Sequence, residues 1–320
     1  MDLGANDVHN SLIVVRAVHF AAATILAGSL IFWTVVAQPI FRSSEEATIV
    51  RLQTLRIAWI TLAIAVVSGV IWVLLQAASM SGLPLGDAMT ADVMSAVVNE
   101  TQFGFVLEIR FVLAIILAAC LAYDRLQWVR WLAVASALGL IAAIAWTGHA
   151  GSTAGEAGLL HLTADVLHLV FAATWIGGLV SLVFLLAVAR RYEADSWAHV
   201  ALRTTQRFST LALISVGSIV ATGIVNAWIL VGSLHALIVT EYGRLLMLKL
   251  ALFAAMLMMA AANRFWLTPR LALPSGCGPQ LKALRQLKRN SVIEIVLGLM
   301  IFGIVGLLGM LHPAIHFDNL

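Results

Sequence analysis

The sequence is poor in charge and in cysteine. Aspartate, glutamate, lysine and arginine make up 11% of its 320 residues, whereas 62% are hydrophobic. Soluble domains carry about 25% charged residues, so this composition excludes an ordinary soluble protein. The two cysteines, Cys120 and Cys277, form no CxxC pair, which argues against a thiolate metal site. A glycine-rich phosphate loop is also lacking, so any transport by this chain is not powered by its own ATP hydrolysis.

Long apolar runs recur along the whole chain. A helix needs roughly 20 residues to cross a bilayer, and eight runs of about that length or more are present: about 12–37, 55–79, 103–123, 127–148, 160–189, 207–233, 243–267 and 291–311. The first ten residues hold no Lys or Arg, so we expect the first run to be a retained span and not a cleavable signal peptide. The sequence therefore predicts an all-α polytopic membrane protein with eight transmembrane helices.

The basic residues determine the predicted orientation. Fifteen of the 19 lie in the loops after the first, third, fifth and seventh runs. The positive-inside rule places these loops in the cytoplasm and both termini outside. Since the basic residues are distributed as loop charges, the net charge of +3 does not indicate nucleic acid binding. The basic stretch 280–289 is predicted to contact lipid head groups.

The two halves of the chain resemble each other. His19 and Gly28 in the first span have the same spacing as His168 and Gly177 in the fifth. Further matches follow in order on corresponding spans: Ser68-Gly69 with Thr222-Gly223, Gly104…Arg110 with Gly243…Lys249, and His149 with His312. A unit of four spans has an even number of crossings, so both copies would have the same orientation. We therefore predict a parallel duplication of a four-helix unit, over residues 1–150 and 151–320.

The two copies differ in one outer loop. The first half has 15 extra residues between its second and third spans, and this region carries Met80, Met89 and Met94. One interpretation is a loop that rests on the membrane surface. The other is a collector for copper, because soft thioether ligands suit Cu(I).

One stretch carries most of the candidate ligands. Gly148-His149-Ala150 is followed by a glycine-rich loop and then by His161, Asp165 and His168, which share one helix face at i, i+4 and i+7. Eight of the nine histidines fall on the predicted outer side. Polar side chains within a membrane are costly and usually functional. Because imidazole is a common ligand of copper, zinc and haem iron, this stretch is a candidate metal site.

Histidines from four separate spans are expected to converge at one depth below the outer surface: His19, His149, His168 and His312. His161 and Asp165 complete the predicted ligand set, with Asp165 either binding the metal or orienting an imidazole. A histidine near a helix end is usually only hydrogen-bonded, and this interpretation applies to three others: His9, His235 and His316.

Three further charges fall within or near the spans. We expect Arg110 and Lys249 either to extend to the outer surface or to pair with a carboxylate such as Glu108. Glu294, near the predicted start of the last span, either pairs with nearby basic residues or helps a cation to leave. The inner half otherwise has few ligands, so inward passage would use sparse groups: Asn226, Thr222 and Met247.

The motif that begins at Gly148-His149-Ala150, continues through His161, Asp165 and His168, and ends at Trp175-x-Gly-Gly resembles the CopD/PcoD copper-resistance family of inner-membrane proteins. This resemblance implies an eight-helix architecture and the passage of copper from the periplasm to the cytoplasm. It also implies a separate periplasmic copper-binding protein of the CopC type as a frequent partner. The matched positions are His149, His161, Asp165, His168 and Trp175.

Two other functions remain open at this point. A helical bundle can hold haem b between histidines of facing helices, with His19/His168 or His149/His312 as the axial pair. Such a protein would be a membrane redox protein. Alternatively, the chain is a membrane scaffold whose histidines only satisfy hydrogen bonds. The copper and haem content of the purified protein separates these functions.

Overall fold

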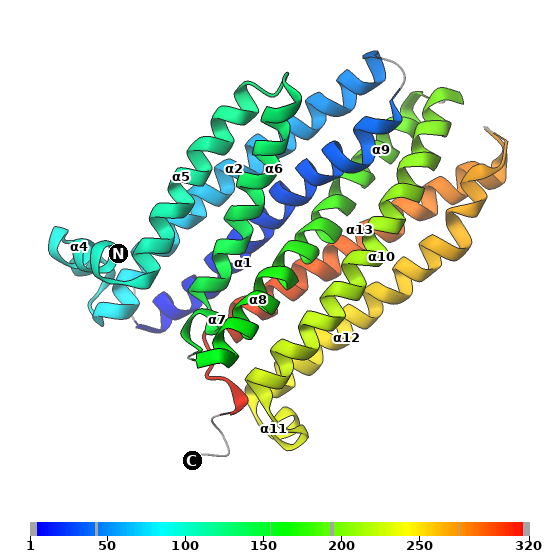
Figure 1. Ribbon diagram of the computed structural model, residues 1–320. Coiled ribbons are helices and arrows are strands. Elements are labelled where there is room, and N and C mark those ends of the chain that lie inside the picture. The colour runs from blue at the N-terminus through cyan, green and yellow to red at the C-terminus, as the bar shows by residue number, and fades with distance from the viewer. Residues whose placement is uncertain (1–4, 42–43, 154, 193–194, 275, 316–320) are drawn as a thin grey trace.

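The computed structural model describes residues 5–41, 44–153, 155–192, 195–274 and 276–315. The described chain forms helices joined by short turns, and eight of these helices are long and apolar enough to cross a membrane (Figure 1). This confirms the predicted all-α, polytopic class. Several helices begin before the apolar run that predicted them, because the helix continues through a polar stretch at its end.

The first four spans pack as one sequential group. The first span is α1 (Ala5–Ile31), which continues through a π-helical turn at Phe32–Ala37. The second is α2 (Ser44–Ser81), the third α5 (Gln102–Ala122) and the fourth α6 (Gln127–Ala142). The region between α2 and α5 forms two short helices, α3 (Leu85–Ala88) and α4 (Ala91–Glu100). The methionine-bearing loop is thus largely helical.

The last four spans follow after a short helix, α7 (His149–Ser152). The fifth span consists of α8 (Gly155–Ala172) and α9 (Gly178–Tyr192), joined by a π-helical turn. The sixth is α10 (Asp195–Val231), and α11 (Leu234–Val239) leads into the seventh, α12 (Glu241–Ala262). A π-helical turn at Asn263–Leu267 ends α12, and the eighth span is α13 (Gly278–Leu308).

The first span forms the centre of the bundle. In an 18-residue apolar segment of this span, 83% of the residues are buried, whereas the corresponding share in the seventh span is 6%. Helix α12 therefore lies at the edge of the bundle. Helix α1 contacts α2, α6, α9 and α13, and it crosses the fifth span at Gly28 and Gly177. A Cβ added at Gly28 would overlap the carbonyl oxygen of Ala173 and the backbone of Gly177. Small residues therefore allow the two helix backbones to touch, as is common within membranes.

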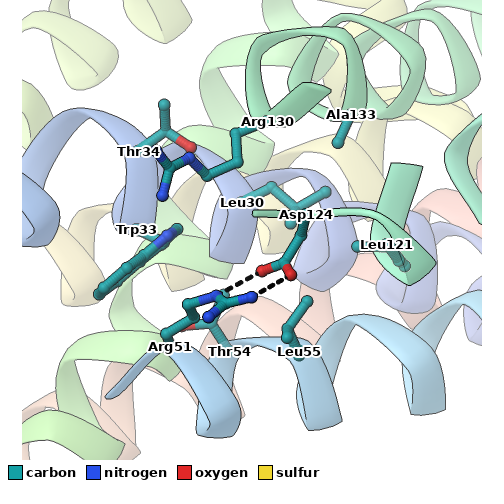
Figure 2. Close-up of a pocket in the computed structure, with 10 residues that line it drawn as sticks. All are labelled: Leu30, Trp33, Thr34, Arg51, Thr54, Leu55, Leu121, Asp124, Arg130 and Ala133. Atoms are coloured by element: carbon teal, nitrogen blue, oxygen red, sulfur yellow. Dashed lines mark hydrogen bonds and ion pairs between the residues drawn. The ribbon is translucent and has the colours of Figure 1, made fainter. Parts of the chain in front are cut away.

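The ends of the bundle differ in what they carry. The start of α1 and the end of α13 lie at the same end as α4, α7 and α11 (Figure 1). This is the predicted outer end. At the opposite end, Arg51 on α2 forms a two-pronged ion pair with Asp124, in the turn between α5 and α6 (Figure 2). The Arg51 Nε to Asp124 Oδ2 distance is 2.7 Å. This pair fastens α2 to the α5–α6 turn.

Candidate functional site

The loop before α8 packs closely against the first turn of that helix. Gly155 has a φ of 75°, which favours glycine, and it begins the helix. A Cβ at Gly158 would overlap the backbone carbonyl of Thr153. This contact keeps the Thr153 side chain beside the first turns of α8, where His161 lies.

The His161 ring is held in one tautomer. Its side chain is 1% exposed, and Nδ1 lies 2.9 Å from the Thr153 hydroxyl. That hydroxyl donates its only proton to the carbonyl oxygen of His149, 3.0 Å away. The threonine therefore accepts from His161 Nδ1–H, and the lone pair of the imidazole resides on Nε2.

The His168 ring is anchored by the same kind of contact. Its Nδ1 lies 3.0 Å from the hydroxyl of Thr222 on α10, and Thr222 donates to the carbonyl oxygen of Ser218 at 2.6 Å. His168 Nδ1–H is thus a donor. Its Nε2 carries a lone pair and has no hydrogen-bond partner among the described residues. Metal-binding histidines typically have this arrangement, with one ring nitrogen fixed by a protein acceptor.

Asp165 lies one turn before His168 and contacts two other elements. Asn226 on α10 donates from Nδ2 to Asp165 Oδ1 at 3.1 Å. Lys249 on α12 is close enough to interact electrostatically with both Asp165 and His168. The Asn226 Oδ1 atom is buried and has no hydrogen-bond partner within the described part of the chain. A carboxylate, an imidazole nitrogen and an orphaned amide oxygen thus lie on neighbouring helices.

His149 lies on the predicted outer side of this group. Its Nε2 donates to the carbonyl oxygen of Leu308 at 3.3 Å, which leaves a lone pair on Nδ1. The ring meets Tyr242 edge-on, with centroids 6.3 Å apart. Burial lowers the pKa of His149, and the nearby Arg16 and His312 lower it further, although the hydrogen bond to Leu308 opposes them. His149 is therefore neutral at pH 7 and able to bind a metal.

His19 is anchored like His168 but is blocked at its second nitrogen. Its Nδ1 lies 3.0 Å from the hydroxyl of Ser68 on α2, and Ser68 donates to the carbonyl oxygen of Ile64. The guanidinium of Arg110, on α5, contacts His19 Nε2. Because a guanidinium can only donate, it occupies the lone pair that a metal would need. Trp72 flanks the ring at a centroid distance of 5.5 Å.

The predicted convergence of four histidines is wrong. Within the described residues, no group of three or more His, Cys, Asp or Glu side chains lies close enough to hold one metal ion. His19 faces α2 and α5 in its own half, whereas His168 faces α10 in the other half. His149 interacts electrostatically with His161 and His312, but His312 is exposed. The two equivalent histidines therefore contact different helices.

The remaining candidates have varied surroundings. His9 and His235 are exposed, as is usual for histidines near helix ends, and His316 lies outside the described residues. Met80 and Met89 are exposed, and Met94 is half-buried on α4. Arg110 is buried and does not extend to the surface, while Glu108 is exposed, so the expected alternatives for Arg110 are both wrong. Its partner is His19.

Comparison with known proteins places this geometry in a family. Residues 6–159 match the family model for the N-terminal domain of copper resistance protein D-like proteins, and residues 202–308 match the model for copper resistance protein D. Copper resistance protein D of Pseudomonas syringae pv. tomato is 31% identical over 79% of this chain and 82% of its own length. The chain belongs to the copper resistance protein D family.

Two further relatives of this copper resistance protein D family member extend the comparison. Inner membrane protein YebZ of Escherichia coli is 26% identical over 94% of this chain and 98% of its own. Copper transport protein CutJ of Bacillus subtilis is 36% identical over 45% of this chain, which corresponds to 26% of its own length. No solved structure matches the chain.

In this copper resistance protein D family chain, sequence reasoning missed the contact of Arg16 and the hydrogen-bond partner of Glu294. Arg16 is 7% exposed and donates from Nη1 to the carbonyl oxygen of Gly309 at 3.0 Å, so it fastens α1 to the end of α13. Glu294 is 1% exposed and accepts from Asn263 at 2.6 Å, so the expected ion pair with nearby basic residues is not its contact. Both are charged residues within apolar runs, and that signal was visible in the sequence.

Proposed function

We propose that this chain is a copper transport protein of the bacterial inner membrane, and that it takes copper from the periplasmic side toward the cytoplasm. The observation that carries this proposal is the state of His168. Its Nδ1–H is committed to Thr222, and its Nε2 lone pair has no partner among the described residues. Copper binds well to such an imidazole nitrogen.

Neighbouring groups support a cation at this position. Asp165 lies one helical turn away, and the Asn226 Oδ1 atom is buried without a described partner. A buried acceptor without a donor is costly. A copper ion near His168 and Asp165 would satisfy it. Lys249 supplies a positive charge beside Asp165 when no metal is bound.

Several ligands in sequence suit transport better than one tight site. His149 and His161 interact electrostatically near the predicted outer end, and each keeps one ring nitrogen available. His168 lies about two helical turns further along α8 than His161. A transported ion must leave each site as readily as it enters, so a few exchangeable ligands at successive depths favour passage.

The haem alternative has less support in this geometry. His19 Nε2 receives the Arg110 guanidinium, so it cannot also bind iron as one member of a His19/His168 pair. In the other predicted axial pair, His312 is exposed whereas His149 is half-buried, so the bundle would not enclose a haem between them.

The same proposal includes a partner protein, a copper-collecting surface and the surrounding lipid. A separate periplasmic copper-binding protein of the CopC type would deliver copper to the outer end. Met80, Met89 and Met94 would collect copper there, because Met80 and Met89 are exposed on the side that carries α3 and α4. Membrane lipid surrounds the spans.

We also propose that residues 1–150 and 151–320 are two copies of one four-helix unit. Equivalent histidines donate from Nδ1 to equivalent hydroxyls, His19 to Ser68 and His168 to Thr222. A Cβ added at Gly69 would lie 3.4 Å from the His19 ring, and one at Gly223 would lie 3.5 Å from the His168 ring. Matching contacts at matching positions support a duplication.

Copper uptake by proteoliposomes tests the transport proposal. Purified protein is reconstituted, copper is added outside, and copper inside is measured over time. We expect His168→Ala to lower the initial rate by about tenfold or more, because a ligand is lost. His9→Ala, which alters an exposed histidine near the same end, is the matched control and should transport normally. A red preparation with a Soret band, or equal rates for both variants, would contradict the proposal.

A further inference from the structure

The predicted inner half of the bundle contains a cavity with a buried carboxyl group. The cavity measures about 170 Å³ and is bounded by α9, α10, the π-helical turn after α12, and α13. Glu294 lines it and is only 1% exposed. Asn263 lies 14 residues beyond Lys249, which is about 21 Å along a helix axis. The cavity is therefore separate from the group around His168.

Glu294 belongs to a short chain of hydrogen bonds between helices. Asn263 donates from Nδ2 to Glu294 Oε1 at 2.6 Å, and Asn290 donates from Nδ2 to Asn263 Oδ1 at 2.9 Å. Asn263 begins the π-helical turn that ends α12. Such turns interrupt regular helix bonding and are frequent at functional sites. The turn places an amide donor against the carboxyl group.

Two buried hydroxyls on the cavity wall have no hydrogen-bond partner in the described parts of the chain. They are Ser291, 0% exposed on α13, and Thr205, 3% exposed on α10. Buried polar groups in native proteins are normally satisfied by protein or by water. Most residues that line the cavity are apolar, but Glu294, Asn263, Ser291 and Thr205 supply polar atoms to its wall. Water molecules beside these groups would have hydrogen-bond partners, and the volume has room for several of them. These two hydroxyls therefore mark positions where water would reach the neighbourhood of Glu294.

The surroundings of Glu294 favour a proton over copper. The polar atoms on the wall are carboxyl, amide and hydroxyl groups, whereas copper prefers imidazole and sulfur. Arg264 is the other charged residue among the lining residues, and its Nη1 donates to Ser209 on α10 at 2.7 Å. Trp175, Leu179 and Leu182 add no titratable group. An unpaired carboxylate in such surroundings is costly, so the group readily holds a proton.

We propose that Glu294 is a proton-exchange site that couples proton movement to copper passage; the coupling rests on the proposed transport function. In the exchange, the O–H bond of the protonated carboxyl breaks and its proton passes to a water in the cavity. The carboxylate that remains accepts the hydrogen bond from Asn263. The reverse step takes a proton from water, and no oxidant or reductant takes part.

Labelling with an apolar carbodiimide tests the proton site without reference to copper. A protonated carboxyl adds across the carbodiimide to give an N-acylurea, which mass spectrometry locates on the Glu294 peptide. We expect labelling at acidic pH that falls by about tenfold per pH unit once the carboxyl ionises. Glu294→Gln should abolish the adduct at this peptide, and Glu108→Gln, an exposed carboxyl on α5, should leave it unchanged. A Glu294 peptide that stays unlabelled at every pH would overturn the proton site.

Copper uptake under an imposed pH gradient tests the coupling. In wild-type proteoliposomes, we expect the uptake rate to change severalfold when the gradient is reversed. Glu294→Gln should keep the Asn263 hydrogen bond through its amide oxygen and lose the response to the gradient. Uptake by the wild type that ignores the gradient would overturn the coupling while the transport function stands. If the wild type takes up no copper at all, the transport proposal and the coupling both fail, and the labelling result still decides the proton site.

Discussion

His19 and His168 occupy corresponding places, nine residues before the glycines at which their helices cross, and their rings are anchored in the same way. Each donates Nδ1–H to a hydroxyl on the next long helix, Ser68 or Thr222. They differ at Nε2. Arg110 contacts that nitrogen in the first half. In the second half, Lys249 stands at the equivalent position, and no hydrogen bond joins it to His168 among the described residues.

This difference concerns how accessible the two rings are to a metal. The first half has a closed polar contact, with His19, Arg110 and Trp72 packed together and buried. The second half has an open one, where His168 is half-buried and Asp165 and Asn226 lie close by. Because the Arg110 guanidinium contacts His19 Nε2, this ring offers no free lone pair to a metal. We infer that the first half is structural at this level and that the second half handles the metal.

The largest effect should come from removing the anchoring hydroxyls. Thr222→Val keeps the side-chain shape but removes the acceptor that fixes the His168 tautomer, so copper affinity should fall by about 10–100-fold. Ser68→Ala is the matched change in the first half and should leave copper affinity unaltered. Equilibrium dialysis of the purified variants measures both. Equal losses in the two variants would remove the distinction between the halves.

Removing the Arg110 guanidinium should make the His19 ring available to copper. Arg110→Met fills a similar volume and frees His19 Nε2, so a second copper equivalent per chain should appear. The same change leaves a buried acceptor unsatisfied, which costs about 1–3 kcal/mol of stability without copper. Lys249→Met is the counterpart and should add no copper equivalent. Metal analysis that finds one equivalent in Arg110→Met would refute the blocking role.

Packing at the helix crossing should matter to both halves alike. Gly28→Ala places a Cβ against the Ala173 carbonyl and the Gly177 backbone, so the helices must separate. Overpacking of this kind costs about 1–3 kcal/mol. The melting temperature in detergent should fall. Gly217→Ala is a suitable control, since a Cβ there meets nothing within 4 Å, and its melting temperature should not fall.

The smallest effect concerns pH. Burial lowers the pKa of His149, whereas in the unfolded chain it titrates near its ordinary value of about 6.5. Below that value the unfolded state binds the proton first, so stability falls as the pH falls. His149→Gln should make the melting temperature less sensitive to pH below about 6.5. His9→Gln, at an exposed position, should show the wild-type slope; a wild-type slope in His149→Gln would refute the prediction.

Much of this architecture was visible in the sequence. Apolar runs predict the eight spans because crossing a bilayer requires a minimum length. The matches between the two halves place Ser68 and Thr222 at corresponding positions, but their hydrogen bonds to His19 and His168 come from the structure. The direction in which each side chain points was not predictable. That direction depends on the rotation of each helix about its axis, which close contacts such as Gly28 on Gly177 determine.

The same limitation explains the errors at the site. His19 and His168 were expected to meet because they lie at the same depth in the membrane. Depth follows from the position of a residue along its span, but two side chains meet only if they also lie on helix faces that point toward each other. Arg110 looked like a residue that extends to the surface, because its partner His19 lies 91 positions away. Glu294 was placed near the start of a helix because the apolar run begins only at about residue 291. Helix α13 in fact begins at Gly278, and its first turns are polar.

X-ray absorption at the copper edge tests the central claim most directly, because it registers imidazole rings bound to the metal. Copper-loaded wild-type protein, His168→Ala and His19→Ala are compared at one copper per chain. We predict that the imidazole signal weakens in His168→Ala and is unchanged in His19→Ala. A weaker signal in His19→Ala, with His168→Ala identical to the wild type, would contradict the account.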